Sequence, residues 1–251
     1  IKEIFSKYDF SYVFHLAAVV GVKLTLSNPL LVLEDLKGIN LLYDYSSSSS
    51  IKKFFFASSS EVYGEPYSIP QNEITTPLNS RLPYAIVKNA GEAYSLAHRE
   101  QSGLRSTNLR FFNTYGPRQR QDFVISIFIE SALKNEPLYI YGDGTQTRTF
   151  CYVEDTVNCI TNLLQPSLDV ESINIGSDKQ LTINDLAKFI IKLTNSSSSI
   201  KYLPALPKGD MTRRQPCCKL LNSVLPRDYR FLELEEGLKK TIDYHIKINK
   251  D

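Results

Sequence analysis

Short apolar segments alternate with longer amphipathic segments along the first part of the chain. Segments 12–18 and 51–57 are short, aromatic and bounded by polar residues, as is typical of buried strands. Apolar residues recur at three- and four-residue spacing in 29–45 and 83–101, which predicts two helices. A third strand is expected at 107–112. The order strand, helix, strand, helix, strand predicts a parallel α/β sheet with right-handed crossovers.

The elements become shorter and less regular after residue 113. The predicted helices here are 123–135, 155–165 and 182–194, and the predicted strands are 138–141 and 172–176. Thr182, with Asp185 three residues later, is expected to cap the third of these helices. Residues 201–251 are expected to form a strand, a basic loop and two short helices.

Composition places the chain among ordinary globular proteins, with 251 residues, 42% hydrophobic and 22% charged. A net charge of +2 gives no reason to expect nucleic acid or a membrane surface as a partner. No apolar run approaches the roughly 20 residues that span a bilayer. The four cysteines lack the spacing of metal ligands, so we expect no metal site. Reduced thiols are expected instead, and with them a cytoplasmic location.

Tyr84 and Lys88 are the first candidates for chemistry, because residues four apart share one face of a helix. A tyrosine is a poor base at neutral pH, since its ordinary pKa is roughly 10. A neighbouring ammonium group favours the phenolate, so Lys88 is expected to lower the pKa of Tyr84. Such a pair suits proton transfer from a sugar hydroxyl during hydride transfer.

Five motifs occur together and in a characteristic order. They are residues 58–64 (Ser-Ser-Ser-Glu-Val-Tyr-Gly), 84–88 (Tyr-Ala-Ile-Val-Lys), 113–118 (Asn-Thr-Tyr-Gly-Pro-Arg), 142–148 (Gly-Asp-Gly-Thr-Gln-Thr-Arg) and 150–155 (Phe-Cys-Tyr-Val-Glu-Asp). The set resembles the extended short-chain dehydrogenase/reductase family, in particular its nucleotide-sugar epimerases, dehydratases and decarboxylases. The resemblance runs from about Tyr12 to about Tyr244. It implies a Rossmann-type doubly wound parallel sheet with a smaller α/β substrate-binding domain.

The resemblance also implies a division into two domains. Residues 1–112 and 150–176 would form the NAD-binding domain, and 113–149 and 177–251 the nucleotide-sugar-binding domain. The Gly-rich strand-turn-helix that opens such folds has no counterpart in the sequence, which implies that about the first quarter is absent. NAD is the expected cofactor, although the acidic residue that separates NAD from NADP is missing with that turn.

Two serine runs, 46–50 and 196–199, fall where relatives have ordinary turns and helix ends. A flexible linker and an imperfectly assigned sequence are both open explanations.

The resemblance assigns three residues to the oxidation of the sugar. Ser59 would hydrogen-bond the reacting hydroxyl, Tyr84 would accept its proton, and Lys88 would tune Tyr84 and bind the nicotinamide ribose. The product of this step is a 4-keto sugar and a reduced cofactor. The residues expected to contact the cofactor are Ala17, Ala18, Ser58, Tyr84, Lys88 and Phe111.

The nucleotide sugar is expected to contact Ser60, Asn113, Arg148 and Arg214, because an arginine fork matches a diphosphate. Glu61 has two open roles, either a second acid/base beside C5 of the sugar or a packed carboxylate that orders its loop.

Two residues depart from the family pattern. Asp35 stands where many relatives have asparagine, and Cys217 where many have aspartate. These changes put a hydrogen bond near the cofactor and a helix cap in doubt.

Three functions remain open on the sequence alone. The first is NAD-dependent epimerisation of a nucleotide-activated sugar, with a UDP-hexose as the expected substrate. The second is UDP-glucuronate decarboxylation or 4,6-dehydration, which the Ser60–Glu61 pair favours, and the third is a non-catalytic nucleotide-binding relative. Helices 29–45 and 83–101 carry more apolar surface than one sheet face requires, so we expect a homodimer.

Overall fold

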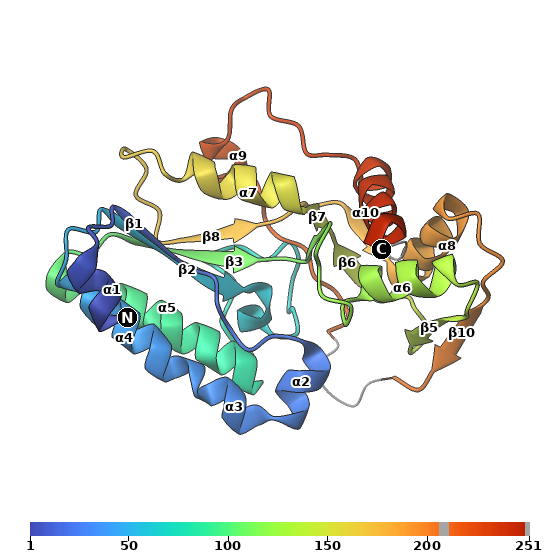
Figure 1. Ribbon diagram of the computed structural model, residues 1–251, viewed down its shortest axis with the longest axis horizontal. Helices are drawn as coiled ribbons and strands as arrows, with labels where there is room; N and C mark the ends of the chain where they lie inside the picture. The colour runs from blue at the N-terminus through green and yellow to red at the C-terminus, as the bar shows by residue number, and fades with distance from the viewer. Residues whose placement is uncertain (206–210, 249–251) are drawn as a thin grey trace.

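A four-stranded parallel sheet lies at the centre of one half of the molecule (Figure 1). The computed structural model describes residues 1–205 and 211–248; part of the predicted basic loop, residues 206–210, and the last three residues lie outside it. The strands, in spatial order, are β1 (Tyr12–His15), β2 (Lys53–Ser59), β3 (Ser106–Phe111) and β8 (Ser172–Ile175). The predicted parallel α/β sheet is therefore confirmed, although β1 ends at His15 rather than at residue 18.

Helices cover both faces of this sheet (Figure 1). One face carries α4 (Asp35–Ser47) and α5 (Pro83–Ser102), and the other carries α7 (Val153–Asn162) and α9 (Lys219–Val224). Successive side chains of a strand point to opposite faces. Phe54 and Phe56 accordingly belong to the apolar core under α4 and α5, and Phe55 to the core under α7 and α9.

The first helices differ in detail from the predicted ones. A short α1 (Lys2–Lys7) precedes the sheet, and α2 (Val22–Ser27) was not predicted. The predicted helix 29–45 is divided into α3 (Pro29–Leu33) and α4 at Glu34, whose φ of −62° and ψ of −25° keep the path nearly continuous. Ser46 and Ser47 lie in the last turn of α4. The first two residues of the serine run 46–50 are therefore helical and not part of a linker.

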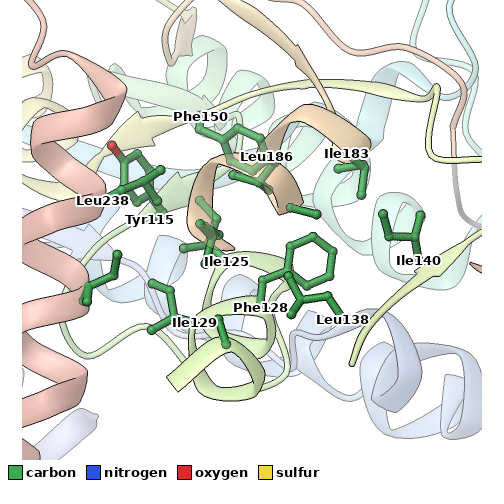
Figure 2. Close-up of a cluster of buried hydrophobic side chains, with 14 of the residues drawn as sticks. Tyr115, Ile125, Phe128, Ile129, Leu138, Ile140, Phe150, Ile183, Leu186 and Leu238 are labelled. Carbon is green, nitrogen blue, oxygen red and sulfur yellow. The ribbon is translucent and has the colours of Figure 1, made fainter. Parts of the chain in front are cut away.

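The other half of the molecule has its own apolar core, shown in Figure 2. Its helices are α6 (Val124–Leu133), α8 (Ile183–Leu193) and α10 (Leu234–Ile248), and its strand pairs are β5 (Leu138–Tyr141) with β10 (Ile200–Leu203), β6 (Thr147–Thr149) with β9 (Gln180–Thr182), and β4 (Thr114–Tyr115) with β7 (Cys151–Tyr152). Thr182 caps α8 as predicted, since its hydroxyl accepts the Asp185 amide at 3.0 Å. The last helix, α10, is 15 residues long rather than short.

One segment crosses the predicted domain boundary. Helix α9 packs on β8, and Leu221 and Leu225 lie in the same core as Phe55 and Ile173. Residues 219–225 therefore belong with the sheet, although 177–251 was assigned to the second domain. The rest of the two-domain division stays a prediction. Among the described residues, no helix combines the length and apolar character needed to cross a membrane.

Helix α5 reaches β2 closely because Gly91 faces the sheet. A Cβ atom at Gly91 would lie 2.1 Å from Cζ of Phe56, a fully buried ring on β2. Any larger residue would push the helix or the ring out of place, since protein cores are close-packed. The height of α5 above the sheet therefore depends on this glycine.

We expect Gly91→Ala to lower the free energy of unfolding by about 1–3 kcal/mol through overpacking against Phe56. Gly38→Ala is the matched control, because Gly38 lies within α4 and a Cβ there would meet nothing within 4 Å. That control should be neutral or stabilising by up to about 1 kcal/mol, since alanine is the better helix former. Urea unfolding measures both; equal stability of the two variants would contradict the packing argument.

Candidate active site

Ser59 and Tyr84 meet at the carboxyl end of β2. Ser59 is the last residue of β2, and its hydroxyl accepts the Glu61 amide at 3.2 Å, which starts the short helix η1 (Ser60–Tyr63). Tyr84 lies in the first turn of α5, directly after Pro83, a residue whose fixed φ suits that position. The Ser59 hydroxyl lies close enough to the Tyr84 phenol to favour its ionised form. The sheet edge thus brings together two groups that can share a proton with a bound hydroxyl.

Lys88 lies one turn further along α5 and is 3% exposed. Its ammonium donates to the Ala57 carbonyl at 2.7 Å and lies 5.6 Å from the centroid of the Tyr84 ring. Lys88 also lies 5.1 Å from the centroid of the Phe56 ring. An ammonium has three protons, so one holds the helix to the strand and two can bind a ligand.

Burial dominates the ionisation of both groups. It raises the pKa of Tyr84 to about 12, with the Ser59 hydrogen bond acting in the opposite direction. It lowers the pKa of Lys88 to about 8, and the neighbouring Asp35 carboxylate opposes that change. The pKa of Tyr84 is therefore raised where the sequence led us to expect a lowered one, because desolvation of the phenol outweighs the charges around it.

The two departures from the family pattern have different consequences. The Asp35 carboxylate accepts the Val19 amide at 2.8 Å, so it is engaged with the loop after β1. Cys217 does not cap α9: Cys218 occupies the N-cap position, and no side chain makes a capping bond there. All four cysteines are free and buried.

Glu61 and Arg214 form an ion pair, with an oxygen–nitrogen distance of 2.5 Å. The two residues are 153 positions apart, and both side chains are largely buried. The Arg214 guanidinium also contacts the Met211 sulfur at 3.2 Å. The second carboxylate oxygen of Glu61, Oε2, is buried without a hydrogen-bond partner. Both charges of the pair act on the pKa of Tyr84, which places the pair near the phenol.

Four of the residues predicted to contact the cofactor lie at or just after the ends of three neighbouring strands. Ala17 is exposed and Ala18 is half-buried after β1, and the half-buried Phe111 ends β3. Ser58 is different, because its hydroxyl donates to Glu92 at 2.5 Å. Any contact between Ser58 and a cofactor would therefore be made by its backbone.

Of three residues predicted to contact the substrate, one is buried and two make internal hydrogen bonds. Ser60 is buried in η1. The Asn113 amide donates to the Thr149 carbonyl at 3.0 Å, and Arg148 donates to the Thr147 carbonyl at 2.8 Å. The expected diphosphate contacts of Asn113 and Arg148 stay predictions.

The sequence interpretation missed a buried polar group next to the site, Glu92 with its partner Arg110. Glu92 follows Lys88 by four residues and Tyr84 by eight, so the helical spacing that singled out the first two residues also marks Glu92. Arg110 gave no comparable signal.

Comparison with known proteins identifies the family. The NAD dependent epimerase/dehydratase family matches residues 1–176 of the 251. The chain therefore belongs to this NAD-dependent family.

Different relatives of the chain carry out different reactions. The UDP-N-acetyl-α-D-glucosaminuronate decarboxylase of Bacillus cytotoxicus is 35% identical, over 100% of this chain and 81% of its own length. The UDP-glucuronate 4-epimerase of Thermodesulfobacterium geofontis is 32% identical, over 97% of this chain and 75% of its own length. Other curated relatives are longer, so that the chain spans 47% of one of them.

A solved structure agrees closely with the fold. The UDP-glucose 4-epimerase of Thermotoga maritima, crystallised with UDP-glucose, has a TM-score of 0.92 and 32% identity to this chain. The match covers 99% of this chain and 81% of the epimerase. The Rossmann-like fold expected from the sequence is thereby confirmed.

The described residues fit one part of NAD, its nicotinamide end. Ala17 and Ala18 after β1 are small and at least partly exposed, and the Lys88 ammonium has protons available for a ribose. The chain contains no Gly-rich turn suited to a pyrophosphate. The residues present therefore account for the reactive end of the cofactor only.

We expect the stability contribution of Lys88 to depend on pH. The Lys88 amine has its ordinary pKa of 10.5 in the unfolded chain and a pKa of about 8 in the folded protein. Between these two pH values the amine is protonated in the unfolded chain but largely neutral in the folded protein. Stability due to Lys88 is then constant below pH 8 and rises between pH 8 and 10.5. Relative to Lys88→Met, the wild type should gain about 1–3 kcal/mol between pH 7 and 10. Urea unfolding without cofactor at both pH values tests this, and an unchanged difference would contradict it.

Proposed function

We propose that the chain is part of an enzyme that epimerises a UDP-hexose at C4 through a 4-keto intermediate. The contact between Ser59 and Tyr84, with Lys88 one turn away, supports oxidation of a sugar hydroxyl at this edge. Bound NAD would supply the hydride acceptor and, as a cation, a charge that favours the Tyr84 phenolate.

Each of the three residues has a distinct task in this proposal. Ser59 holds the C4 hydroxyl by a hydrogen bond and fixes its orientation. Tyr84 accepts the hydroxyl proton as hydride leaves C4. It would return the proton when hydride comes back to the other face of C4, after the keto sugar has turned. Lys88 holds a ribose hydroxyl through its remaining protons and adds positive charge near the phenolate.

The Glu61–Arg214 ion pair is our reason for preferring an epimerase of a neutral hexose over an enzyme that acts on a uronate. A uronate has a carboxylate at C6, and its recognition requires a cation whose charge is not already compensated. Here the Arg214 charge is balanced by Glu61 at 2.5 Å, so the pair as a whole is neutral. A neutral pair suits a neutral hexose better than a uronate, because a second carboxylate would be repelled by Glu61.

A decarboxylase or a 4,6-dehydratase is the alternative, and two observations favour it. Glu61 Oε2 is buried and has no partner, so it could exchange a proton with C5 of a 4-keto sugar. The similarity to a decarboxylase over the whole chain supports the same alternative.

Product analysis separates these reactions. The full-length protein with NAD is incubated with UDP-glucose, UDP-N-acetylglucosamine or UDP-glucuronate. We expect a C4 epimer of a neutral UDP-sugar and no net NADH. Carbon dioxide and a UDP-pentose from UDP-glucuronate would overturn the epimerase.

Tyr84→Phe should lower kcat at least about 100-fold with nearly unchanged substrate binding, since it removes only the general base.

Glu61→Gln sharpens the comparison, because glutamine can still accept a bond from Arg214 but cannot take up a proton. An epimerase should keep kcat within about tenfold, whereas a decarboxylase that uses Glu61 as an acid/base should lose about 100-fold or more.

We also propose a homodimer in the cytoplasm. Large apolar side chains lie exposed on the outer side of α3, α4 and α5: Leu30, Leu33, Leu41, Ile86 and Leu96. Two copies could bury this surface as a four-helix interface of roughly 1,000 Å² or more. The four free, buried cysteines suit a reducing compartment.

Light scattering of the full-length protein at micromolar concentration should give twice the monomer mass. Leu41→Lys should shift the protein towards monomer, because a charge would enter the interface. Lys188→Glu, on α8 and away from this surface, serves as the control. A monomeric wild type would contradict the proposed dimer.

A further inference from the structure

A nearly buried ion pair lies beneath the candidate site. Glu92 of α5 is 7% exposed and Arg110 of β3 is 4% exposed. Two parallel bonds join them, Nε to Oε1 at 2.9 Å and Nη2 to Oε2 at 2.7 Å. A buried ion pair adds little net stability over apolar residues of the same volume, because both charges lose their hydration. Its role is therefore better sought in what else the two side chains hold.

The Glu92 carboxylate joins the catalytic helix to the end of β2. Its Oε1 also accepts the Ser58 hydroxyl at 2.5 Å, and Ser58 directly precedes Ser59. On α5, Glu92 follows Lys88 by one turn and Tyr84 by about two turns. One carboxylate thus fixes the strand end and the helix relative to each other.

The Arg110 guanidinium extends this connection to the segment after β2. Its Nη1 donates to the Tyr63 hydroxyl at 2.9 Å and to the Glu73 carbonyl at 3.0 Å. The Tyr63 hydroxyl in turn donates to Asn174 Oδ1 on β8 at 2.7 Å. Tyr63 is the last residue of η1, the helix that carries Glu61. Both ends of the Ser59–η1 segment are therefore attached to the same ion pair.

We propose that Ser58, Glu92, Arg110 and Tyr63 form a positioning network that holds Ser59 and Glu61 against the catalytic helix. None of the four side chains is assigned to the substrate; they act through the backbone of the residues that are. A misplacement of about 1 Å can reduce a rate up to about 100-fold, so the network would govern the chemical step. This inference rests on the proposed sugar oxidation.

Single hydroxyl deletions test the network with the least disturbance. Ser58→Ala removes the bond to Glu92, and Tyr63→Phe removes the link between Arg110 and β8. Glu92→Ala is unsuitable, because it would leave a buried guanidinium unpaired and unfolding would confound the result. Ser95→Ala is the matched control: its hydroxyl is equally buried on α5 and donates to Ser106 at 2.6 Å, outside the network.

The readouts are kcat, KM and the single-turnover rate of NAD reduction in the full-length protein with NAD, each per folded molecule. We expect Ser58→Ala and Tyr63→Phe to lower kcat and the single-turnover rate about tenfold, with KM within about twofold. Ser95→Ala should leave all three unchanged, although its Tm falls by a similar amount. If both network variants turn over like Ser95→Ala, the network only stabilises the fold and the proposal is overturned.

Hydrogen exchange keeps this test independent of the proposed function. The amides of 57–63 should exchange faster in Ser58→Ala and Tyr63→Phe but not in Ser95→Ala. An inactive wild type with this exchange pattern would contradict the sugar chemistry and support the positioning network. Unchanged exchange in both network variants would contradict the network itself.

Discussion

The distance between α5 and β2 is the constraint on which the site depends. Gly91 lets the helix approach the Phe56 ring, and the Lys88 ammonium then reaches the Ala57 carbonyl at 2.7 Å. The same approach brings Tyr84 to Ser59. Proton transfer requires groups at hydrogen-bonding distance, so close packing of apolar surfaces is here a condition for the chemistry.

This close approach also buries charge. Lys88, Glu92 and Arg110 are all at most 7% exposed, and each would be unfavourable alone in a core. Each has a partner at 2.7 Å: a carbonyl for Lys88, and the opposite charge for Glu92 and Arg110. Burial leaves Lys88 with a pKa of about 8 and Tyr84 with one of about 12. The polar atoms beneath the sheet edge are thus ordered before any ligand arrives.

The fold and much of the site were predictable because their signals are local. The aromatic run of β2 and the cap at Thr182 depend on neighbouring residues, and Tyr84 and Lys88 are one helical turn apart. Long-range pairing was not predictable. Glu61 and Arg214 were each singled out, but nothing in the sequence joins residues 153 positions apart. Strand periodicity likewise gives the face of Ser58 but not the acceptor of its hydroxyl.

The segment that carries Arg214 is held to the rest of the protein by main-chain hydrogen bonds on both sides of Pro216. The Gln71 amide donates to the Gln215 carbonyl and the Cys217 amide donates to the Gln71 carbonyl, both at 2.7 Å. These are main-chain bonds, which most substitutions leave intact. The segment can therefore vary in sequence while its path is kept, and the residues on β2 and α5 that we propose for sugar oxidation are untouched by such changes. Under the proposed function, substrate preference could diverge in evolution at the Arg214 segment while the groups on β2 and α5 stay the same.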